Sequence, residues 1–161
     1  MPIRERNHRL ERELYRGLVS VSFTLCIQDR TPAFKEPAIT TIFTEILRDV
    51  IAPSRCMLPV YCFMPDHLHM LISGTSNDSD ILGTAVAYKQ KTGFWLSRNN
   101  PGIKWQKDFY DHIIRKNESI GVQVRYILDN PVRKGLVNSW QHYPYKGSIG
   151  CDLNAVLNSI I

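Results

Sequence analysis

The sequence predicts an α+β fold in which one antiparallel sheet has two helices on one face. Two kinds of pattern support this class within 161 residues. Some short segments alternate apolar and polar residues, as a half-buried strand does, and longer segments repeat apolar residues at helical spacing. A chain of this length buries about two-thirds of its unfolded surface, which is enough for one core.

The first strand is predicted at 18–27, and its two faces differ in chemistry. One face is apolar, while the other is small and carries Ser20, Ser22, Thr24 and Cys26. A helix is predicted at 38–50, where six apolar residues form a single stripe. A proline before this segment and another after it suit the helix entry and exit.

Two further strands are predicted at 56–63 and 67–73, joined by a tight turn at 64–66. Pro59 lacks a backbone N–H, so it indicates an edge strand or an irregularity. In the third strand, His67, His69 and Leu71 share one face because side chains two apart point the same way.

A second helix is predicted from Ile81 to the break at 99–102, with Ser79 or Asp80 as its cap. A short strand is expected near 103–106. The last helix is predicted at about 117–129 and is expected to end at Asn130-Pro131, because the residue before proline avoids the α region.

The resulting order, β-α-β-β-α-β with an added helix, is typical of a ferredoxin-like sandwich. The added helix is expected to cross the open face of the sheet. Residues 1–161 are interpreted as a single domain, with a basic N-terminal arm at 1–16 and a C-terminal tail at 147–161.

The charge distribution favours a polyanionic partner. The net charge is +5, and residues 81–146 alone carry eleven basic and four acidic side chains. Nucleic acid is the commonest such partner. No segment has the roughly 18 apolar residues that a membrane span needs, so no membrane partner is expected. Four cysteines without paired spacing indicate reduced thiols, and the expected location is the cytoplasm.

His67 and His69 are the first candidate metal ligands. Two neutral imidazoles on one strand face can hold a divalent cation, although the same spacing also occurs in ordinary core or surface histidines. Tyr126 and Asn130 are four residues apart on the last predicted helix. They could supply a nucleophile and an amide ligand, or be a half-buried tyrosine and a helix-ending asparagine.

Four segments together resemble single-tyrosine HUH transposases of the REP-associated branch. Residues 61–69, which include Met64-Pro65-Asp66-His67-Leu68-His69, are similar to the family's paired-histidine signature. Residues 105–115 and 126–132 follow in the family's order, and so do Gly135, Leu136 and the aromatic residues near 140–145. The resemblance covers roughly residues 15–146.

This resemblance implies metal-dependent nicking and strand transfer of single-stranded DNA at hairpin-forming repeats. It makes Tyr126 the nucleophile that forms a 5′-phosphotyrosine, and His67, His69 and Asn130 the ligands of Mg²⁺ or Mn²⁺. The expected partner is single-stranded or hairpin DNA, and the oligomeric state is open between monomer and homodimer. The basic residues expected to bind DNA are Arg115, Lys116, Arg125, Arg133, Lys134, Lys89 and Lys91.

Two alternatives are compatible with the same residues. The chain could bind structured DNA or RNA without catalysis, although the polar face of the first strand lacks stacking aromatics. It could also be a phosphodiesterase in which a metal activates water, which would need a further carboxylate. Asp66 is adjacent to His67 but is expected to point to the opposite strand face. Tyr110 is the main rival nucleophile, and His112 is an available base.

Overall fold

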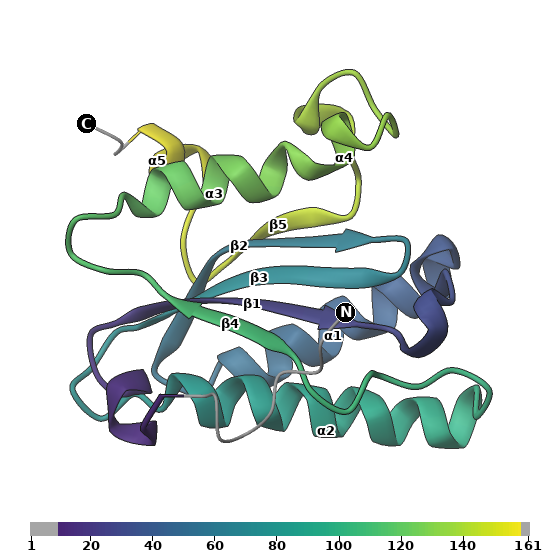
Figure 1. Cartoon of the computed structure of the whole chain (residues 1–161), viewed down its shortest axis with the longest axis horizontal. Coiled ribbons are helices and arrows are strands. Elements are labelled where there is room, and N and C mark those ends of the chain that lie inside the picture. Colours follow the sequence, from purple (N-terminus) through teal and green to yellow (C-terminus); the bar gives the residue numbers. More distant parts are fainter. Residues whose placement is uncertain (1–9, 159–161) are drawn as a thin grey trace.

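A computed structural model describes residues 10–158, which form a five-stranded antiparallel sheet with helices on both faces (Figure 1). The order of the strands is β4-β1-β3-β2-β5, so β3 is central. Their bounds are β1 (Ser20–Cys26), β2 (Cys56–Met64), β3 (His67–Gly74), β4 (Tyr110–Ile113) and β5 (Lys146–Ile149).

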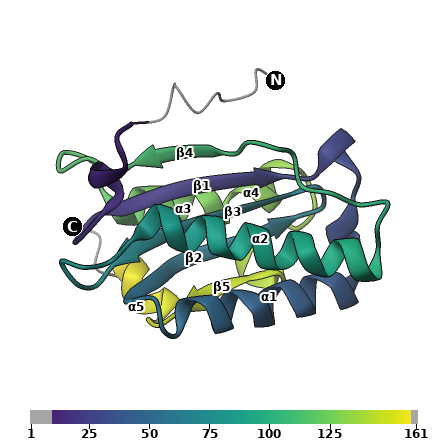
Figure 2. The ribbon, with the colours of Figure 1, turned by 90° about the horizontal axis from the view of Figure 1, so that it is seen from below.

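The helices divide between the two faces as the sequence predicts. Helices α1 (Pro37–Ile51) and α2 (Ile81–Asn99) cover one face, and α3 (Ile120–Leu128) and α4 (Asn130–Arg133) lie over the other (Figures 1 and 2). Helix α5 (Leu153–Asn158) packs beside α3 and β2. The ferredoxin-like prediction, with a tyrosine-bearing helix on the second face, is confirmed.

The larger core lies between the sheet and the helices α1 and α2. The apolar face of β1 enters it with Phe23 and Leu25, which pack in the same cluster as Phe43 and Leu47 of α1. The alternation seen in the sequence therefore determines which face of β1 is buried here. The polar face of β1 is left on the side of α3.

A second core fixes α3 on the side of the sheet that carries the histidines. Both β2 and α3 contribute apolar side chains to it, and Leu71 of β3 lies at its base. Its buried members are Val60, Cys62, Met64, Leu71, Val124, Ile127, Leu128 and Tyr143. This contact determines which way every other side chain of α3 points.

The strand expected near 103–106 is not formed, and the fourth strand lies later, at β4. Within 103–106 the backbone makes an isolated bridge between Trp105 and Ile27. Trp105 is 8% exposed, and its indole N–H donates to Oγ1 of Thr92 on α2 at 2.8 Å. The segment covers α2 with its tryptophan instead of joining the sheet.

Two prolines behave differently from their sequence interpretation. Pro59 lies in β2, which is paired on both sides, so the edge assignment is wrong. The expected irregularity is confirmed by shifts of register between Met57 and Val60 and between Leu58 and Tyr61. Pro131 does not end helical structure, because it occupies the first turn of α4, where a missing N–H costs nothing.

The two ends of the chain were only partly assigned from the sequence. The predicted basic arm lies within the described residues only from residue 10 onward, where Arg12–Tyr15 form a 3₁₀ turn. The predicted tail at 147–161 includes most of β5, which pairs with β2, and the whole of α5. Residues 1–9 and 159–161 lie outside the described part.

Candidate functional site

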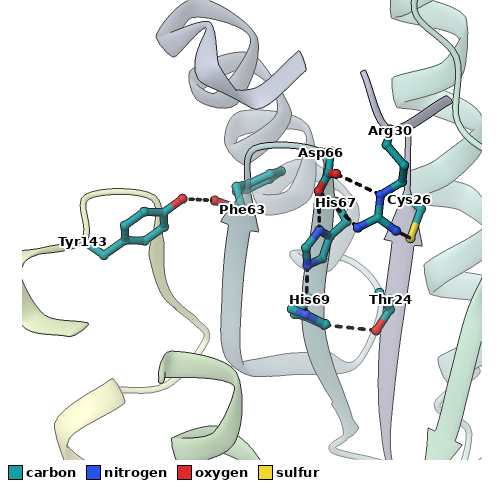
Figure 3. Close-up of polar contacts among 8 residues, drawn as sticks. All are labelled: Thr24, Cys26, Arg30, Phe63, Asp66, His67, His69 and Tyr143. Atoms are coloured by element: carbon teal, nitrogen blue, oxygen red, sulfur yellow. Dashed lines mark hydrogen bonds and ion pairs between the residues drawn. The ribbon is translucent and has the colours of Figure 1, made fainter. Parts of the chain in front are cut away.

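Strand β3 presents His67 and His69 together on the face that α3 covers. Their Nε2 atoms are 3.1 Å apart, and the two rings meet edge to face, with centroids 4.7 Å apart (Figure 3). The two-residue spacing predicts this shared face, and the structure confirms it. Both imidazoles are therefore aimed at one point above the centre of the sheet.

Each imidazole is held through its other nitrogen. Nδ1 of His67 lies 2.7 Å from Oδ1 of Asp66, and Nδ1 of His69 lies 3.0 Å from Oγ1 of Thr24, its partner across the β1–β3 ladder. One directional set of hydrogen bonds satisfies all three contacts. Thr24 donates to His69, His69 donates from Nε2 to His67, and His67 donates from Nδ1 to Asp66.

The hydroxyl of Thr24 also permits a second arrangement, in which His69 no longer donates a hydrogen bond to His67. A threonine hydroxyl both donates and accepts, so Thr24 can accept from Nδ1–H of His69. Both Nε2 atoms would then carry free lone pairs. In metal sites, ligating histidines are commonly oriented through their second nitrogen in this way. Thr24 was placed on this face by the alternation of β1 but was not identified as a site residue.

Asp66 faces the histidines, contrary to the expectation from strand alternation. It lies in the turn between β2 and β3, where alternation no longer fixes side-chain direction. Arg30 binds its carboxylate from the other side, with Nε donating to Oδ2 at 2.8 Å (Figure 3). Arg30 has a φ of 56°, in a short 3₁₀ segment after β1, and no sequence signal indicated it.

Burial keeps both imidazoles neutral near pH 7. Burial lowers the pKa of His69 to about 3, and the charges of His67 and Arg133 act in the same direction. Burial also lowers the pKa of His67, against the opposing effect of Asp66. For Asp66, burial alone would raise the pKa, but hydrogen bonds from Arg30 and His67 lower it overall. Neutral imidazole is the form that binds a metal.

The spacing of the imidazoles fits a shared cation. Two nitrogens bound at about 2.1 Å and at right angles to one another lie about 3.0 Å apart. The observed separation of the Nε2 atoms is 3.1 Å. Within residues 10–158, no group of three His, Cys, Asp or Glu side chains is placed to hold a metal. A third ligand from the protein must therefore be of another kind, such as an amide.

Asn130 is a buried amide of this kind. It is 7% exposed, at the start of α4, and in the described part of the chain its side chain makes no hydrogen bond. A buried amide without a partner costs free energy, so such groups are rare unless they serve a site. Its carbonyl oxygen is a suitable ligand for a hard cation.

Charges on α4 reach the imidazoles and show that this helix lies near them. Lys134, directly after α4, helps to lower the pKa of His67, and Arg133 helps to lower that of His69. Figure 1 shows α4 at the end of the molecule where β2 turns into β3. The end of α3 and the start of α4 therefore approach the histidine pair from above.

Tyr126 lies on the outer side of α3. Its neighbours Val124 and Ile127 are buried against the sheet, whereas Tyr126 is 62% exposed, and the guanidinium carbon of Arg133 lies 4.2 Å from its ring centroid. The shared face expected for Tyr126 and Asn130 is thus split, with the phenol in solvent and the amide buried. Among the described residues, neither side chain is hydrogen bonded to an imidazole.

The other predicted DNA-binding residues are dispersed. Arg125 is exposed on α3, while Arg115 and Lys116 lie in the loop before α3, at its end far from α4 (Figure 1). Lys89 and Lys91 are on α2, on the opposite face of the sheet from the histidines. Lys89 donates to the carbonyl of residue 107 and lies over the ring of Phe109, 5.4 Å from its centroid.

The remaining aromatic and histidine candidates have other roles in the structure. The hydroxyl of Tyr143 donates to the carbonyl of Phe63 in the second core. His112 lies on β4 with Nε2 2.9 Å from Oε2 of Glu118. Tyr110 is on the edge strand β4. In the part of the chain that is described, no helix is long and apolar enough to cross a membrane.

Comparison with known proteins identifies a family and a matching fold. The sequence model described as "Transposase IS200 like" matches residues 17–130, which is more than half of the chain. A Haemophilus influenzae protein assigned by name as a REP-associated tyrosine transposase is 28% identical over 136 residues. That match covers 76% of this chain and 76% of the relative.

Two solved structures share the fold. The structure of a REP-associated tyrosine transposase bound to a REP hairpin has a TM-score of 0.71 and 21% identity, covering 86% of this chain and 79% of that chain. A structure assigned to a transposase of Deinococcus radiodurans R1 has a TM-score of 0.50 and 18% identity, covering 72% of this chain and 92% of that chain.

The state of Asn130 leads to a stability prediction. Replacing this amide by leucine in Asn130→Leu removes a buried polar group that has no partner within residues 10–158, so we expect the free energy of unfolding in EDTA to rise by about 1–2 kcal/mol. The exposed Asn138 serves as the control, and Asn138→Leu should change stability by less than about 0.5 kcal/mol. Urea unfolding measures both. A loss of stability in Asn130→Leu would show that the amide is well paired.

Proposed function

Because the chain belongs to the IS200-like transposase family, we propose that it nicks and joins single-stranded DNA with Tyr126 as nucleophile. Membership of the family makes the chain a DNA transposase. The proposal assigns the residues that carry the reaction, the cation and the kind of DNA. The observation that carries it is the pair of neutral imidazoles whose Nε2 atoms are 3.1 Å apart, below a helix that bears an exposed tyrosine.

His67, His69 and Asn130 are proposed as the protein ligands of Mg²⁺ or Mn²⁺. Three properties support this set: the spacing of the imidazoles, their neutral state, and the buried amide of Asn130, which none of the described side chains pairs with. When bound, such an ion would polarise a non-bridging oxygen of the scissile phosphate. Asp66 and Thr24 orient the imidazoles from behind, so that the ligand nitrogens are directed before DNA arrives.

Tyr126 is proposed to attack the scissile phosphate. Its exposure on α3 leaves the phenol open to an incoming DNA strand. In the step, the phenol oxygen forms a bond to phosphorus and the bond from phosphorus to the 3′ oxygen breaks. The phenol loses a proton to solvent, and the departing 3′ oxygen takes one up. The phosphotyrosine keeps the bond energy, so a second 3′-OH can reverse the step and join two strands.

The DNA is proposed to be a single strand or hairpin held by the positive charge around α3 and α4. Arg125, Arg133 and Lys134 lie on or directly beside these helices, and all three are exposed. The solved relative with the same fold is bound to a REP hairpin, which supports a hairpin as the partner here. Binding through phosphates should weaken as salt is raised.

Hydrolysis by a metal-activated water is the competing reaction that the same ligands could support. Asp66 is the carboxylate next to the imidazoles, but Arg30 and His67 already occupy both of its oxygens. It is therefore better placed to orient His67 than to take a proton from water. The two reactions leave different products, since hydrolysis leaves no DNA attached to the protein.

We predict that the chain forms a covalent DNA adduct that depends on Tyr126. The purified protein is mixed with Mn²⁺ and denatured single-stranded fragments of the host genome, and adducts are captured under denaturing conditions and sequenced. Tyr126→Phe should reduce the adduct by at least about 10³-fold, because it removes the nucleophilic oxygen. Tyr110→Phe, on the edge strand β4, should behave like the wild type.

The DNA capture has two results that would overturn the assignment. Cleavage without an adduct would indicate attack by water. An adduct that persists in Tyr126→Phe, or that maps to another tyrosine by peptide mass, would move the nucleophile elsewhere. A wild-type protein that binds the fragments but neither cleaves nor attaches to them would be a binding protein only.

We also predict that Asp66 supports metal binding through His67. Asp66→Asn removes the negative charge behind the imidazole, so the Kd for Mn²⁺ measured by calorimetric titration should rise by about 10–100-fold. Asp78 makes an exposed ion pair with Arg55 at 3.0 Å, and Asp78→Asn controls for the loss of one negative charge. Equal Mn²⁺ affinities in both variants would contradict the role given to Asp66.

A further inference from the structure

Arg133 lies two helical turns beyond Tyr126 and on the same side. The intervening Asp129 keeps right-handed helical dihedral angles, with φ −73° and ψ −12°. Seven residues correspond to almost two full turns of an α-helix. The guanidinium of Arg133 consequently lies over the ring of Tyr126, with its carbon 4.2 Å from the centroid.

The N–H groups of Arg133 are available for a ligand. Some arginines of the described residues are ion-paired, as Arg30 is with Asp66 and Arg12 with Asp80. Arg133 is exposed, and across residues 10–158 it has no ion pair and no side-chain hydrogen bond. Stacking on the ring uses only the flat face of the guanidinium, so its N–H fork stays open in the plane.

The charge of Arg133 also acts on one imidazole of the pair. It is one of the influences that lower the pKa of His69. The guanidinium therefore contacts the Tyr126 ring and is near enough to His69 for its charge to act there.

We propose that Arg133 binds the scissile phosphate through its N–H fork while its flat face holds the Tyr126 ring beside that phosphate. This inference rests on the proposed function and adds one residue to it. A guanidinium fork matches two oxygens of a phosphate and stabilises charge that builds on them during attack. The same side chain thereby fixes the nucleophile and the bond to be broken relative to each other.

The neighbouring basic side chains do not share this arrangement. Arg125 is adjacent to Tyr126 in sequence but has no ring contact among the described residues. Lys134 acts on His67 and offers a point charge without a flat face or a fork. Both are suited to sequence-tolerant binding of the DNA backbone, whereas Arg133 is placed to act on the reacting phosphate.

The test compares Arg133→Gln and Arg133→Lys with the wild type on a DNA fragment captured as an adduct. Single-turnover adduct formation should slow by about 10²–10³-fold in Arg133→Gln, the cost of removing one preorganised charged donor. DNA affinity should fall by less than about tenfold, because one phosphate contact of several is lost. Arg133→Lys keeps the charge without the fork and should give an intermediate rate.

Arg48→Gln is the matched control, because Arg48 is exposed on α1, on the opposite face of the sheet. It removes the same charge and should leave the adduct rate unchanged. Thermal unfolding of all variants should coincide, since Arg133 is exposed. A neutral methylphosphonate at the scissile position should abolish the difference between wild type and Arg133→Gln, because it removes an oxygen that the fork binds.

The outcomes separate this inference from the proposed function. No adduct in the wild type would overturn the proposed function itself. An adduct on Tyr126 that forms equally fast in Arg133→Gln would overturn only the role of Arg133. A variant that loses affinity but keeps its single-turnover rate at saturating DNA would likewise show that Arg133 binds backbone phosphates and not the reacting one.

Discussion

The hydrophobic contact between α3 and the histidine face of the sheet sets the positions of Tyr126 and Asn130 over that face. Val124, Ile127 and Leu128 are buried against β2 and β3, which turns Tyr126 outward and carries the chain down to a buried Asn130. The strength of this contact follows from ordinary apolar burial, at about 25 cal/mol per Å² removed from water. The burial of Val124, two positions before Tyr126, thus orients the proposed nucleophile.

The buried polar groups of the candidate site lower the stability of the fold, and the larger core between the sheet and the helices α1 and α2 offsets this cost. Two imidazoles are kept neutral by burial and a buried amide has no partner in the described structure. Imidazole nitrogens directed at one point and a buried amide without a partner among the described residues cost stability, and both are kinds of group that a cation can bind. The aromatic cluster of Phe34, Phe43 and Trp105 lies on the other face of the sheet, so its packing is separate from these buried polar groups.

Much of the fold could be predicted because its determinants are local. The alternation of β1 and β3 placed Thr24, His67 and His69 on one face, and helical spacing located α1, α2 and α3. The features that the sequence did not predict depend on tertiary contacts. The segment around Trp105 forms no strand because its indole packs on α2, and β5 pairs with β2 through a short stretch that has no pattern of its own. Arg30 reaches Asp66 through a left-handed backbone that the sequence does not reveal.

The central claim is that the two imidazoles and the Asn130 amide are ligands of one cation. A crystal structure of the protein grown with Mn²⁺, with anomalous scattering recorded from the manganese, tests it directly. We expect one anomalous peak bonded to Nε2 of His67, Nε2 of His69 and Oδ1 of Asn130. A peak held by other residues, or imidazoles that keep their mutual hydrogen bond at saturating Mn²⁺, would contradict it.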